Sequence, residues 1–380
     1  MSGLAQDTKN INLVILPEHI PLYNVKESIQ ACEYVTENRI RFIKNYTNNQ
    51  SGYLCINTRE YTLDTFTKEI DDGSKFSQQF KLICKNTNIH FIFINLHESE
   101  LDENIIIFLE KLFSLGVSSD RITIANNDVD ISKFNKFGIN THRTHMIEKT
   151  YGGGYKELPI QFNENKNGKK FLCLNNIKRE HRVALLTLLE KENLLNNINY
   201  SLVGSDYFPL TNNVLNDETI KSYNSTITKF HEKMYYTDFE LNKSQNFFYT
   251  ICVDDFLNSF VNIITETFYL ENKVHISEKS LKPFWFYQLP IFVASTGHVS
   301  KVKEKYNFDL FDDIIDHSYD TITNSVKRLE AIVEEIKRVN NLDLKNIYKN
   351  NKDRFISNRL KCESYLDSNE DYLFFKQIFI

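Results

Sequence analysis

The stretch Lys169-Lys-Phe-Leu-Cys-Leu-Asn-Asn-Ile-Lys-Arg-Glu-His-Arg182 decides the fold, because one element ends and another begins within it. Its apolar run, Phe171–Asn175, is short and bounded by polar residues, which predicts a buried strand. Glu180–Asn193 follows after a few residues and carries apolar residues at helical spacing. A strand that passes through a short turn into a helix is the repeating unit of a parallel α/β sheet.

The same alternation continues on both sides of this stretch. Helices are predicted over Glu103–Leu115, which stops at Gly116, and over Ile322–Val339. The chain is therefore predicted to be an α/β protein with mostly parallel sheets. Further strands are predicted from apolar, β-branched and aromatic runs at Ile11–Leu16, Ile89–Asn95, Arg121–Ala125, Tyr200–Val203, Phe248–Val253, Val261–Thr265 and Pro290–Ala294.

The chain is long enough for two such domains, since 380 residues exceed one ordinary α/β core. The alternation lapses around the glycines Gly152–Gly154 and the polar run Asn163–Gly168, which predicts a linker there. We predict domains over residues 10–145 and 168–340. A helical tail over residues 341–380 follows, and its terminal aromatic residues are expected to dock on a domain surface.

The composition disfavours several classes of protein. A net charge of −5 argues against a dedicated nucleic-acid binder, which usually carries a basic excess. With eleven glycines and neither a GxGxxG nor a GxxxxGK[ST] pattern, glycine-rich phosphate cradles are disfavoured, so bound phosphate would need cationic side chains and helix N-termini. The six cysteines form no CxxC pair, and no signal core or run of about 18 apolar residues occurs. We expect a cytoplasmic protein without a membrane span.

A first group of charged residues follows the strand Phe171–Asn175. Its members are Lys178, Arg179, His181 and Arg182, at the start of the next helix. Open parallel sheets bind ligands beyond the carboxyl ends of their strands. Because the helix dipole disfavours cations at a helix start, the two arginines suggest that an anion such as phosphate completes the site. A solvated basic turn is the alternative.

A second group follows the strand Val261–Thr265. The spacing of Lys279 and Lys282 places both on one helical face, and Ser277 is a candidate N-cap for that helix. The pattern alone is also typical of a capped surface helix. The candidate ligand-binding residues of this group are Glu266, Glu278, Lys279, Lys282 and, in the loop after the last predicted strand, His298.

The stretch Ile276-Ser-Glu-Lys-Ser-Leu-Lys-Pro-Phe-Trp-Phe-Tyr-Gln-Leu-Pro-Ile-Phe-Val-Ala294 resembles the (V/I)TEK…A…G..P(I/V) segment of fucosyltransferase-type glycosyltransferases. Together with Phe171–Arg182 and Tyr306–Asp320, it also resembles a group of virus- and phage-encoded glycosyltransferases. That group carries TEK-x-x-KP-(F/I), FLCLN…R.HR and GF..F…ID.SYD segments. The resemblance spans residues 169–340, and the N-terminal half is similar to no family that we can name.

The resemblance implies a GT-B architecture, in which two Rossmann-like domains face each other across a cleft. The C-terminal domain would hold a nucleotide-sugar donor, UDP- or GDP-linked, and no further cofactor is implied. In such enzymes the residues that match Glu278 and Lys279 contact the donor ribose and diphosphate, and an arginine matched by Arg182 or Arg179 also meets the diphosphate. Ser277 stands where the family has threonine, and the bulky residues Trp285–Gln288 replace small ones, so the donor stays open.

We expect an inverting, metal-independent transfer of a sugar to a hydroxyl acceptor, in the host cytoplasm if the chain is viral. Arg182, Lys279 and Lys282 would stabilise the leaving diphosphate, and a base must accept the proton of the acceptor hydroxyl. That base is expected on the N-terminal domain, where we select Glu98 and Asp128 as catalytic candidates. Other loop candidates after the strand ends are His97, Glu100 and Asp130.

Several alternatives stay open. Asp128-Val-Asp130 is a DxD pattern, which would hold Mn²⁺ or Mg²⁺ in a metal-dependent GT-A enzyme. His142 and His145 lack the further ligands of a zinc site in the sequence around them. The acceptor is a glycan or a hydroxylated base in DNA, and the acidic net charge favours the glycan. A non-catalytic nucleotide- or carbohydrate-binding module is the alternative from another class.

Overall fold

A computed structural model of the chain divides into two compact units, Met1–Thr150 with Asn369–Ile380, and Tyr151–Ser368. The division between Thr150 and Tyr151 falls beside the glycines of the predicted linker, whereas its polar run, Asn163–Gly168, belongs to the second unit. Most of the predicted tail, up to residue 368, belongs to the second unit. The structure describes residues 12–16, 52–57, 67–95, 102–126, 132–143, 156–204, 214–236, 253–270 and 274–367, apart from 69, 74, 157, 159, 215 and 216.

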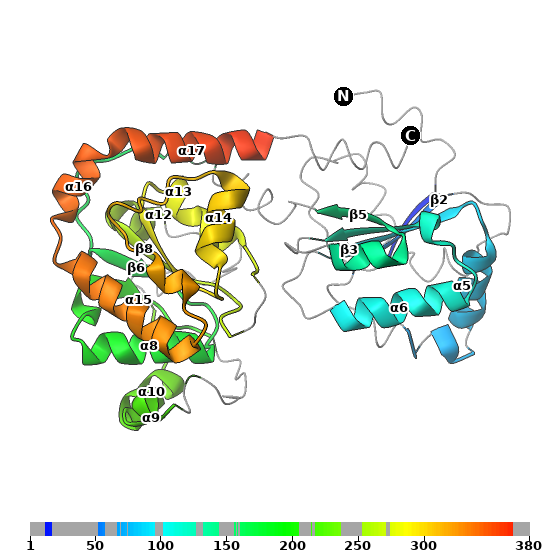
Figure 1. The fold of residues 1–380 in the computed structure, drawn as a ribbon, viewed down its shortest axis with the longest axis horizontal. Helices are drawn as coiled ribbons and strands as arrows, with labels where there is room; N and C mark the ends of the chain where they lie inside the picture. Colours follow the sequence, from blue (N-terminus) through cyan, green and yellow to red (C-terminus); the bar gives the residue numbers. More distant parts are fainter. Residues whose placement is uncertain are drawn as a thin grey trace. The chain divides into compact units, whose positions relative to one another are not determined.

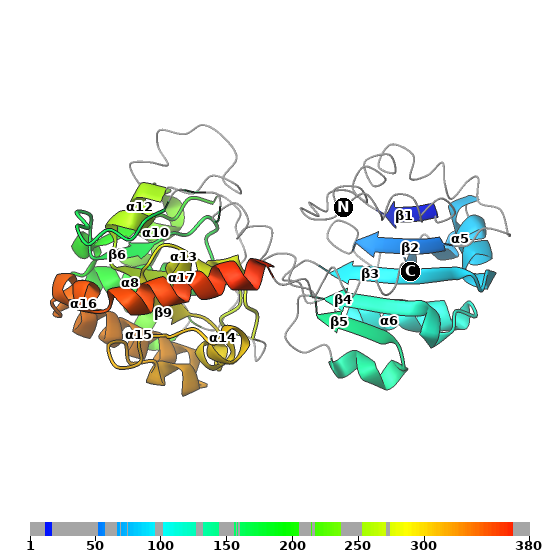
Figure 2. The ribbon, with the colours of Figure 1, turned by 90° about the horizontal axis from the view of Figure 1, so that it is seen from above.

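The first unit contains a five-stranded parallel sheet in the sequential order β1-β2-β3-β4-β5. Figure 2 shows the five strands side by side, with their arrowheads at one edge. The helices α5 (Lys75–Lys85) and α6 (Asp102–Ser114) cover one face of this sheet (Figure 1). The strands are β1 (Asn12–Leu16), β2 (Gly52–Asn57), β3 (Ile89–Asn95), β4 (Ile122–Asn126) and β5 (Asn140–Arg143), with short 3₁₀ turns η1 (Ser119–Arg121) and η2 (Ser132–Phe137) beside β4 and β5.

Aromatic side chains join this sheet to its two helices. Phe91 and Phe93 are two residues apart on β3, so they point to the same face of the sheet. Phe91 packs edge-on against Phe80 of α5 at 6.3 Å between ring centroids, and Phe93 against Phe108 of α6 at 5.3 Å. Alternate phenylalanines of β3 thus each contact one phenylalanine of a covering helix. Helix α6 ends at Ser114, and Gly116, the residue predicted to stop it, lies two positions further on with a φ of +88°.

The second unit contains a four-stranded parallel sheet in the order β7-β6-β8-β9. The chain forms β6 first, adds β7 on one side of it, and then adds β8 and β9 on the other side. The direction of winding therefore reverses between β6 and β8. Such a reversal is the topological switch point at which open α/β sheets bind ligands. The strands are β6 (Phe171–Cys173), β7 (Ile198–Tyr200), β8 (Val261–Thr265) and β9 (Leu289–Val293).

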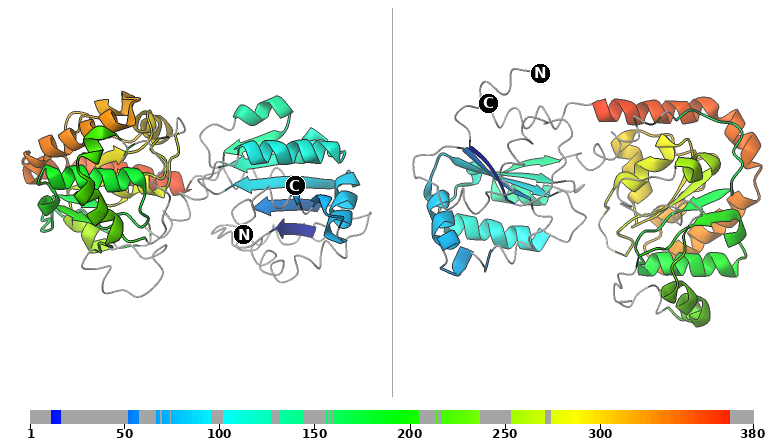
Figure 3. Two further views of the ribbon diagram at one scale, coloured as in Figure 1. Left: turned by 90° about the horizontal axis from the view of Figure 1, so that it is seen from below. Right: turned by 180° about the vertical axis from the view of Figure 1, so that it is seen from behind.

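Helices cover both faces of the second sheet, as Figures 1 and 3 show. One face carries α8 (Glu180–Lys191) and α15 (Ser325–Asn340), and the other carries α13 (Lys282–Trp285) and α17 (Lys352–Asp367). The other elements within the described residues of this unit are η3 (Leu195–Asn197), α9 (Glu218–Lys221), α10 (Asn224–Glu232), α12 (Val253–Asn258), η4 (Glu278–Leu281), α14 (His298–Tyr306), η5 (Ser318–Thr321) and α16 (Leu344–Asn350).

Two predicted strands of the second unit need correction. The strand predicted at Tyr200–Val203 lies earlier, at Ile198–Tyr200, and Leu202 instead forms an isolated bridge with Tyr235. Val253, the end of the strand predicted from residue 248, begins the helix α12, whose first turn contains two aspartates that favour a helix N-terminus. Residues 248–252 lie outside the described residues.

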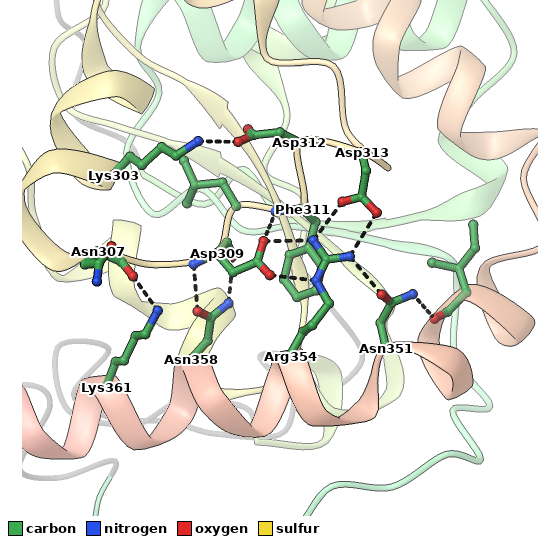
Figure 4. Close-up of polar contacts among 12 residues, drawn as sticks. Lys303, Asn307, Asp309, Phe311, Asp312, Asp313, Asn351, Arg354, Asn358 and Lys361 are labelled. Carbon is green, nitrogen blue, oxygen red and sulfur yellow. Dashed lines mark hydrogen bonds and ion pairs between the residues drawn. The ribbon is translucent and has the colours of Figure 1, made fainter.

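Helix α17 is tied to the segment between α14 and η5 by Arg354. Its guanidinium donates to both carboxylate oxygens of Asp309, at 2.6 and 2.9 Å, and to both of Asp313, at 3.0 and 2.7 Å (Figure 4). It also lies 4.6 Å over the ring of Phe311, whose backbone has a φ of +60°. Asn358, one turn further along α17, donates to the Asp309 carbonyl oxygen at 2.7 Å. These contacts fix the last described helix on the second unit.

Within the described ranges, none of the helices combines the length and the apolar character needed to cross a membrane.

Candidate functional site

The residues that were predicted to bind a ligand gather at the switch point of the second sheet. A side-chain hydrogen bond joins the two chain segments there: the Thr265 hydroxyl, at the end of β8, donates to Asn175 Oδ1, just beyond β6, at 2.5 Å. The chain then turns into α8 after β6, and into the segment Glu266–Tyr269 after β8. Both predicted groups of charged residues therefore start from one place on the sheet.

Three side chains from the start of α8 hold the segment that follows β8. Arg182 Nη2 donates to the Thr265 carbonyl oxygen at 3.1 Å, His181 Nε2 to that of Glu266 at 3.0 Å, and Arg179 Nη1 to that of Thr267 at 2.9 Å. The acceptor of the His181 bond is a carbonyl, so the proton of this ring lies on Nε2. Burial, with the neighbouring arginines, lowers the pKa of His181 well below its usual value. Side chains of the first predicted group thus hold the backbone of residues 265–267, the segment that carries Glu266 of the second group.

Glu266 is fully buried and binds the turn that begins η4. Its carboxylate accepts hydrogen bonds from the hydroxyls of Ser277 and Ser280, at 2.7 and 2.6 Å, and lies 3.8 Å from Lys279 Nζ. Burial alone would raise its pKa, but electrostatic interactions, of which that with Lys279 is the largest, and the Ser280 bond together lower the pKa to about 2. Glu266 is therefore a buried anion at neutral pH.

His298 lies beneath this turn rather than at the surface. Its side chain is 0% exposed, and burial is the main cause that lowers its pKa. Because the Ser280 hydroxyl proton is directed to Glu266, His298 Nε2 donates to Ser280 Oγ, at 2.9 Å. The sequence suggested that His298 touches phosphate directly, but in this arrangement it reaches the site through Ser280.

Arg179 and Lys279 converge on Thr267. Arg179 donates to the Thr267 carbonyl oxygen at 2.9 Å, and Lys279 Nζ donates to its hydroxyl oxygen at 3.1 Å. Arg179 is half-buried and the Lys279 side chain is 27% exposed, so both residues are partly exposed to solvent. Arg182, by contrast, is 4% exposed, and its two terminal nitrogens donate to carbonyl oxygens. Arg179 is therefore the more accessible of the two arginines.

Glu278 and Lys282 lie on either side of Lys279 in the sequence and are both half-buried. Burial lowers the pKa of Lys282, and the nearby Glu278 opposes that shift. The net charge of the three segments 175–182, 265–267 and 275–282 is positive. Their five cations, Lys178, Arg179, Arg182, Lys279 and Lys282, exceed their three carboxylates, Glu180, Glu266 and Glu278, by two charges when the histidines are neutral. A doubly charged anion would balance the cluster.

Two parts of this site were not predicted from the sequence. Thr267 received no role, although it directly follows Glu266. The second part is a group of contacts around Tyr269, whose ring stacks on that of His181 at 5.1 Å between centroids. The guanidinium of Arg328, on α15, lies 4.5 Å from the centroid of the Tyr269 ring and also donates to the Tyr269 carbonyl oxygen at 2.6 Å. Arg328 is distant in sequence, so no local pattern indicated this contact.

The third segment of the resemblance, Tyr306–Asp320, has a structural role beside the site, because two of its residues hold β9 and the start of α14. The Asp320 carboxylate accepts from the backbone N–H groups of Val299 and Ser300, at 3.0 and 3.1 Å, and so occupies the N-terminus of α14. The Tyr319 hydroxyl accepts from the backbone N–H of Phe292, on β9, at 3.0 Å. This helix N-terminus therefore already holds a carboxylate.

The catalytic candidates Glu98 and Asp128 lie outside the described residues, as do the alternatives His97, Glu100 and Asp130. Among the residues that are described, no three His, Cys, Asp or Glu side chains are grouped as a metal site would require.

Comparison of the chain with protein-family models, with curated proteins and with solved structures gives no match.

Proposed function

We propose that this chain is a glycosyltransferase that binds a nucleotide-sugar donor on its second unit. The observation that carries the proposal is the convergence of Arg179 and Lys279 on Thr267 at the switch point of the sheet. Two partly exposed cations from different elements can bind the two phosphates of one diphosphate. The excess of two positive charges in the cluster matches the two negative charges of a nucleoside-diphosphate sugar.

The proposed reaction is an inverting transfer to a hydroxyl acceptor that needs no metal ion. Negative charge develops on the leaving diphosphate as the glycosidic bond breaks, and cations that are already in place stabilise it without reorganisation. Arg179 and Lys279 would provide this stabilisation, with Lys282 beside them. Glu278 would contact the ribose, and Glu98 or Asp128 would take the acceptor proton.

The GT-B architecture, the acceptor and the cellular location are also part of the proposal. The two parallel sheets are compatible with the two Rossmann-like domains of a GT-B enzyme, in which the first unit would receive the acceptor. A glycan is the preferred acceptor because the chain has a net charge of −5, and a hydroxylated DNA base is the alternative. We propose a cytoplasmic location for this activity.

Binding of the donor nucleotide is the direct test. The melting temperature of the full chain would be measured with UDP, GDP, CMP and ADP, each with and without EDTA. A nucleotide at a hundred times its dissociation constant stabilises a protein by about 2.7 kcal/mol. We expect UDP or GDP to raise the melting temperature, and the increase to survive EDTA.

Variants locate the bound nucleotide. Lys279→Ala and Arg179→Ala should each abolish most of the increase in melting temperature. The matched control is Lys337→Ala, which removes an exposed lysine of the same unit that pairs with Glu192, and it should keep the full increase. The proposal is wrong if no nucleotide stabilises the chain, or if Lys279→Ala responds as the unmodified protein does. An increase that EDTA removes would favour the metal site at Asp128 and Asp130 instead.

A further inference from the structure

Glu266 is a buried carboxylate that is attached to a single turn. Its oxygens accept from the hydroxyls of Ser277 and Ser280, its Oε1 lies 3.4 Å from the Ser277 backbone N–H, and its Oε2 lies 3.8 Å from Lys279 Nζ. All these contacts come from four consecutive residues at the start of η4. The end of β8 and the turn that carries Lys279 are therefore held together by one side chain.

The lowered pKa shows that the surroundings compensate the charge of Glu266, but the fold does not need a charge at this position. Moving a carboxylate out of water costs several kcal/mol, and well-packed apolar residues often stabilise a fold as well as a buried ion pair does. A buried charge that fixes one cation in one position has a different use, because a cation that is already oriented loses less freedom when it binds an anion.

We propose that Glu266 is a positioning residue, which holds Lys279 and the Ser277–Ser280 turn in the arrangement that receives the diphosphate. Glu266 itself is fully buried and acts through Lys279. The part of the inference that concerns diphosphate rests on the proposed function. The part that concerns the order of the turn can be measured without any ligand.

His298 extends this arrangement to the end of β9. It donates to Ser280 Oγ at 2.9 Å, and the Ser280 hydroxyl donates onward to Glu266 at 2.6 Å. A hydroxyl that receives one hydrogen bond and donates another has a fixed direction. The chain from His298 through Ser280 and Glu266 to Lys279 thus joins the loops that follow β8 and β9.

The test replaces Glu266 by Gln, which keeps the shape of the side chain and removes its charge. Hydrogen exchange of the backbone over residues 277–282 would be measured in the full chain without ligand. Binding of UDP and of GDP would be measured by calorimetry on the same samples. Loss of a charge-assisted hydrogen bond costs about 1.5–3 kcal/mol, so exchange in the turn should become about tenfold faster or more, and nucleotide binding about tenfold weaker or more.

Glu335→Gln is the matched control. Glu335 is also buried, accepts from the backbone N–H of Asp316 at 2.8 Å and pairs with Arg338 at 2.7 Å, but it lies on α15. Its replacement should change the exchange of residues 277–282 and nucleotide binding by less than about twofold, since it shares no partner with the turn. Glu266→Asp keeps the charge on a shorter side chain and should restore part of the lost binding.

The outcomes separate the two proposals. If the unmodified chain binds UDP or GDP and Glu266→Gln binds it equally well with an unchanged turn, the positioning role is refuted while the proposed function stands. If the unmodified chain binds neither nucleotide, the proposed function fails, and exchange of the turn alone decides the role of Glu266. Should Glu266→Gln not fold, Ser280→Ala removes one of its hydrogen bonds and retains the charge. If backbone hydrogen exchange in the turn of Ser280→Ala is as slow as in the unmodified chain, the inference is overturned.

Discussion

Arg179 and Lys279, one hundred positions apart in the sequence, donate to two oxygen atoms of the same residue, Thr267. The first comes from the start of α8, which follows β6, and the second from η4, after β8. Neighbouring parallel strands bring these segments to one end of the sheet. This convergence turns two separate basic patterns into one candidate anion site.

Thr267→Val tests whether the Thr267 hydroxyl helps to orient Lys279. Valine keeps the shape and the backbone carbonyl that Arg179 uses, and it removes the acceptor of the Lys279 bond. One neutral acceptor contributes about 1 kcal/mol, so binding of UDP or GDP should weaken by about fivefold. Thr187→Val is the control, because this buried hydroxyl donates to the Val183 carbonyl within α8 and away from the site. Equal nucleotide affinity of the two variants would contradict the prediction.

Lys166 should make the stability of the second unit depend on pH. Its amine is buried, donates to the Ser259 carbonyl oxygen at 2.9 Å and lies 4.6 Å over the Tyr348 ring, and burial lowers its pKa from 10.5 to about 7. Between about pH 7 and 10.5 the unfolded chain therefore binds a proton that the folded chain does not, so folding becomes more favourable as the pH rises. At about 1.4 kcal/mol for each pKa unit, the lowering from 10.5 to about 7 gives a gain of the order of 5 kcal/mol.

Lys166→Met removes this dependence and isolates it from other titrating groups. The variant should be more stable than the unmodified chain at pH 6.5, and the difference should shrink as the pH approaches 10. Thermal unfolding at several pH values measures the difference. Lys352→Met provides the comparison, because that amine is half exposed over the ring of Phe162. A difference for Lys166→Met that stays constant from pH 6.5 to 10 would show that the lysine keeps an ordinary pKa.

Arg354→Ala should loosen α17. The substitution removes bonds to Asp309 and Asp313 and the contact with Phe311. These ion pairs are partly exposed, so we expect a cost of about 1–2 kcal/mol and faster hydrogen exchange across Lys352–Asp367. Lys303→Ala breaks an ion pair with Asp312 that is more exposed, and it should cost less than about 0.5 kcal/mol. Similar exchange of α17 in the two variants would refute the anchoring role.

Arg121→Lys should destabilise the first unit. The buried guanidinium donates to the carbonyl oxygens of Ile89, Cys84 and Asn86, at 2.8, 3.1 and 2.6 Å, and lysine cannot reproduce this planar set of donors. The Asn86 carbonyl keeps a second donor, the Ile89 N–H at 3.2 Å, but each buried carbonyl that loses its partner costs about 1–3 kcal/mol, so the total should be about 2 kcal/mol. Hydrogen exchange of β3 and β4 would report it. The exposed substitution Lys136→Ala should have no comparable effect.

The order of strands and helices could be predicted because apolar runs of strand length alternate with helical spacing. Ile89–Asn95 and Val261–Thr265 agree with the structure residue by residue. The strands β2 and β5 were missed. Asn140–Arg143 contains no hydrophobic residue, so hydrophobic patterning could not indicate a strand there.

The predicted grouping of basic residues at one end of the second sheet agrees with the structure, but their depth could not be predicted. Arg179 and Arg182 have the same chemistry and lie three positions apart, and the resemblance gave some preference to Arg182. Their exposure depends on how α8 is rotated against β6 and β8, which only the packed structure defines. The burial of Glu266 and His298 has the same origin, since each is enclosed by residues from elements that are distant in sequence.

The hydroxyl of Tyr319 has a consequence for the border of the second sheet. β9 is one of the two edge strands of the described sheet, so its far side would offer backbone groups to a strand from another chain. By accepting the N–H of Phe292, the phenol occupies one of the positions that an incoming strand would need. The Tyr319 side chain thus hinders the pairing of another strand with this edge of the sheet, and with it edge-to-edge aggregation.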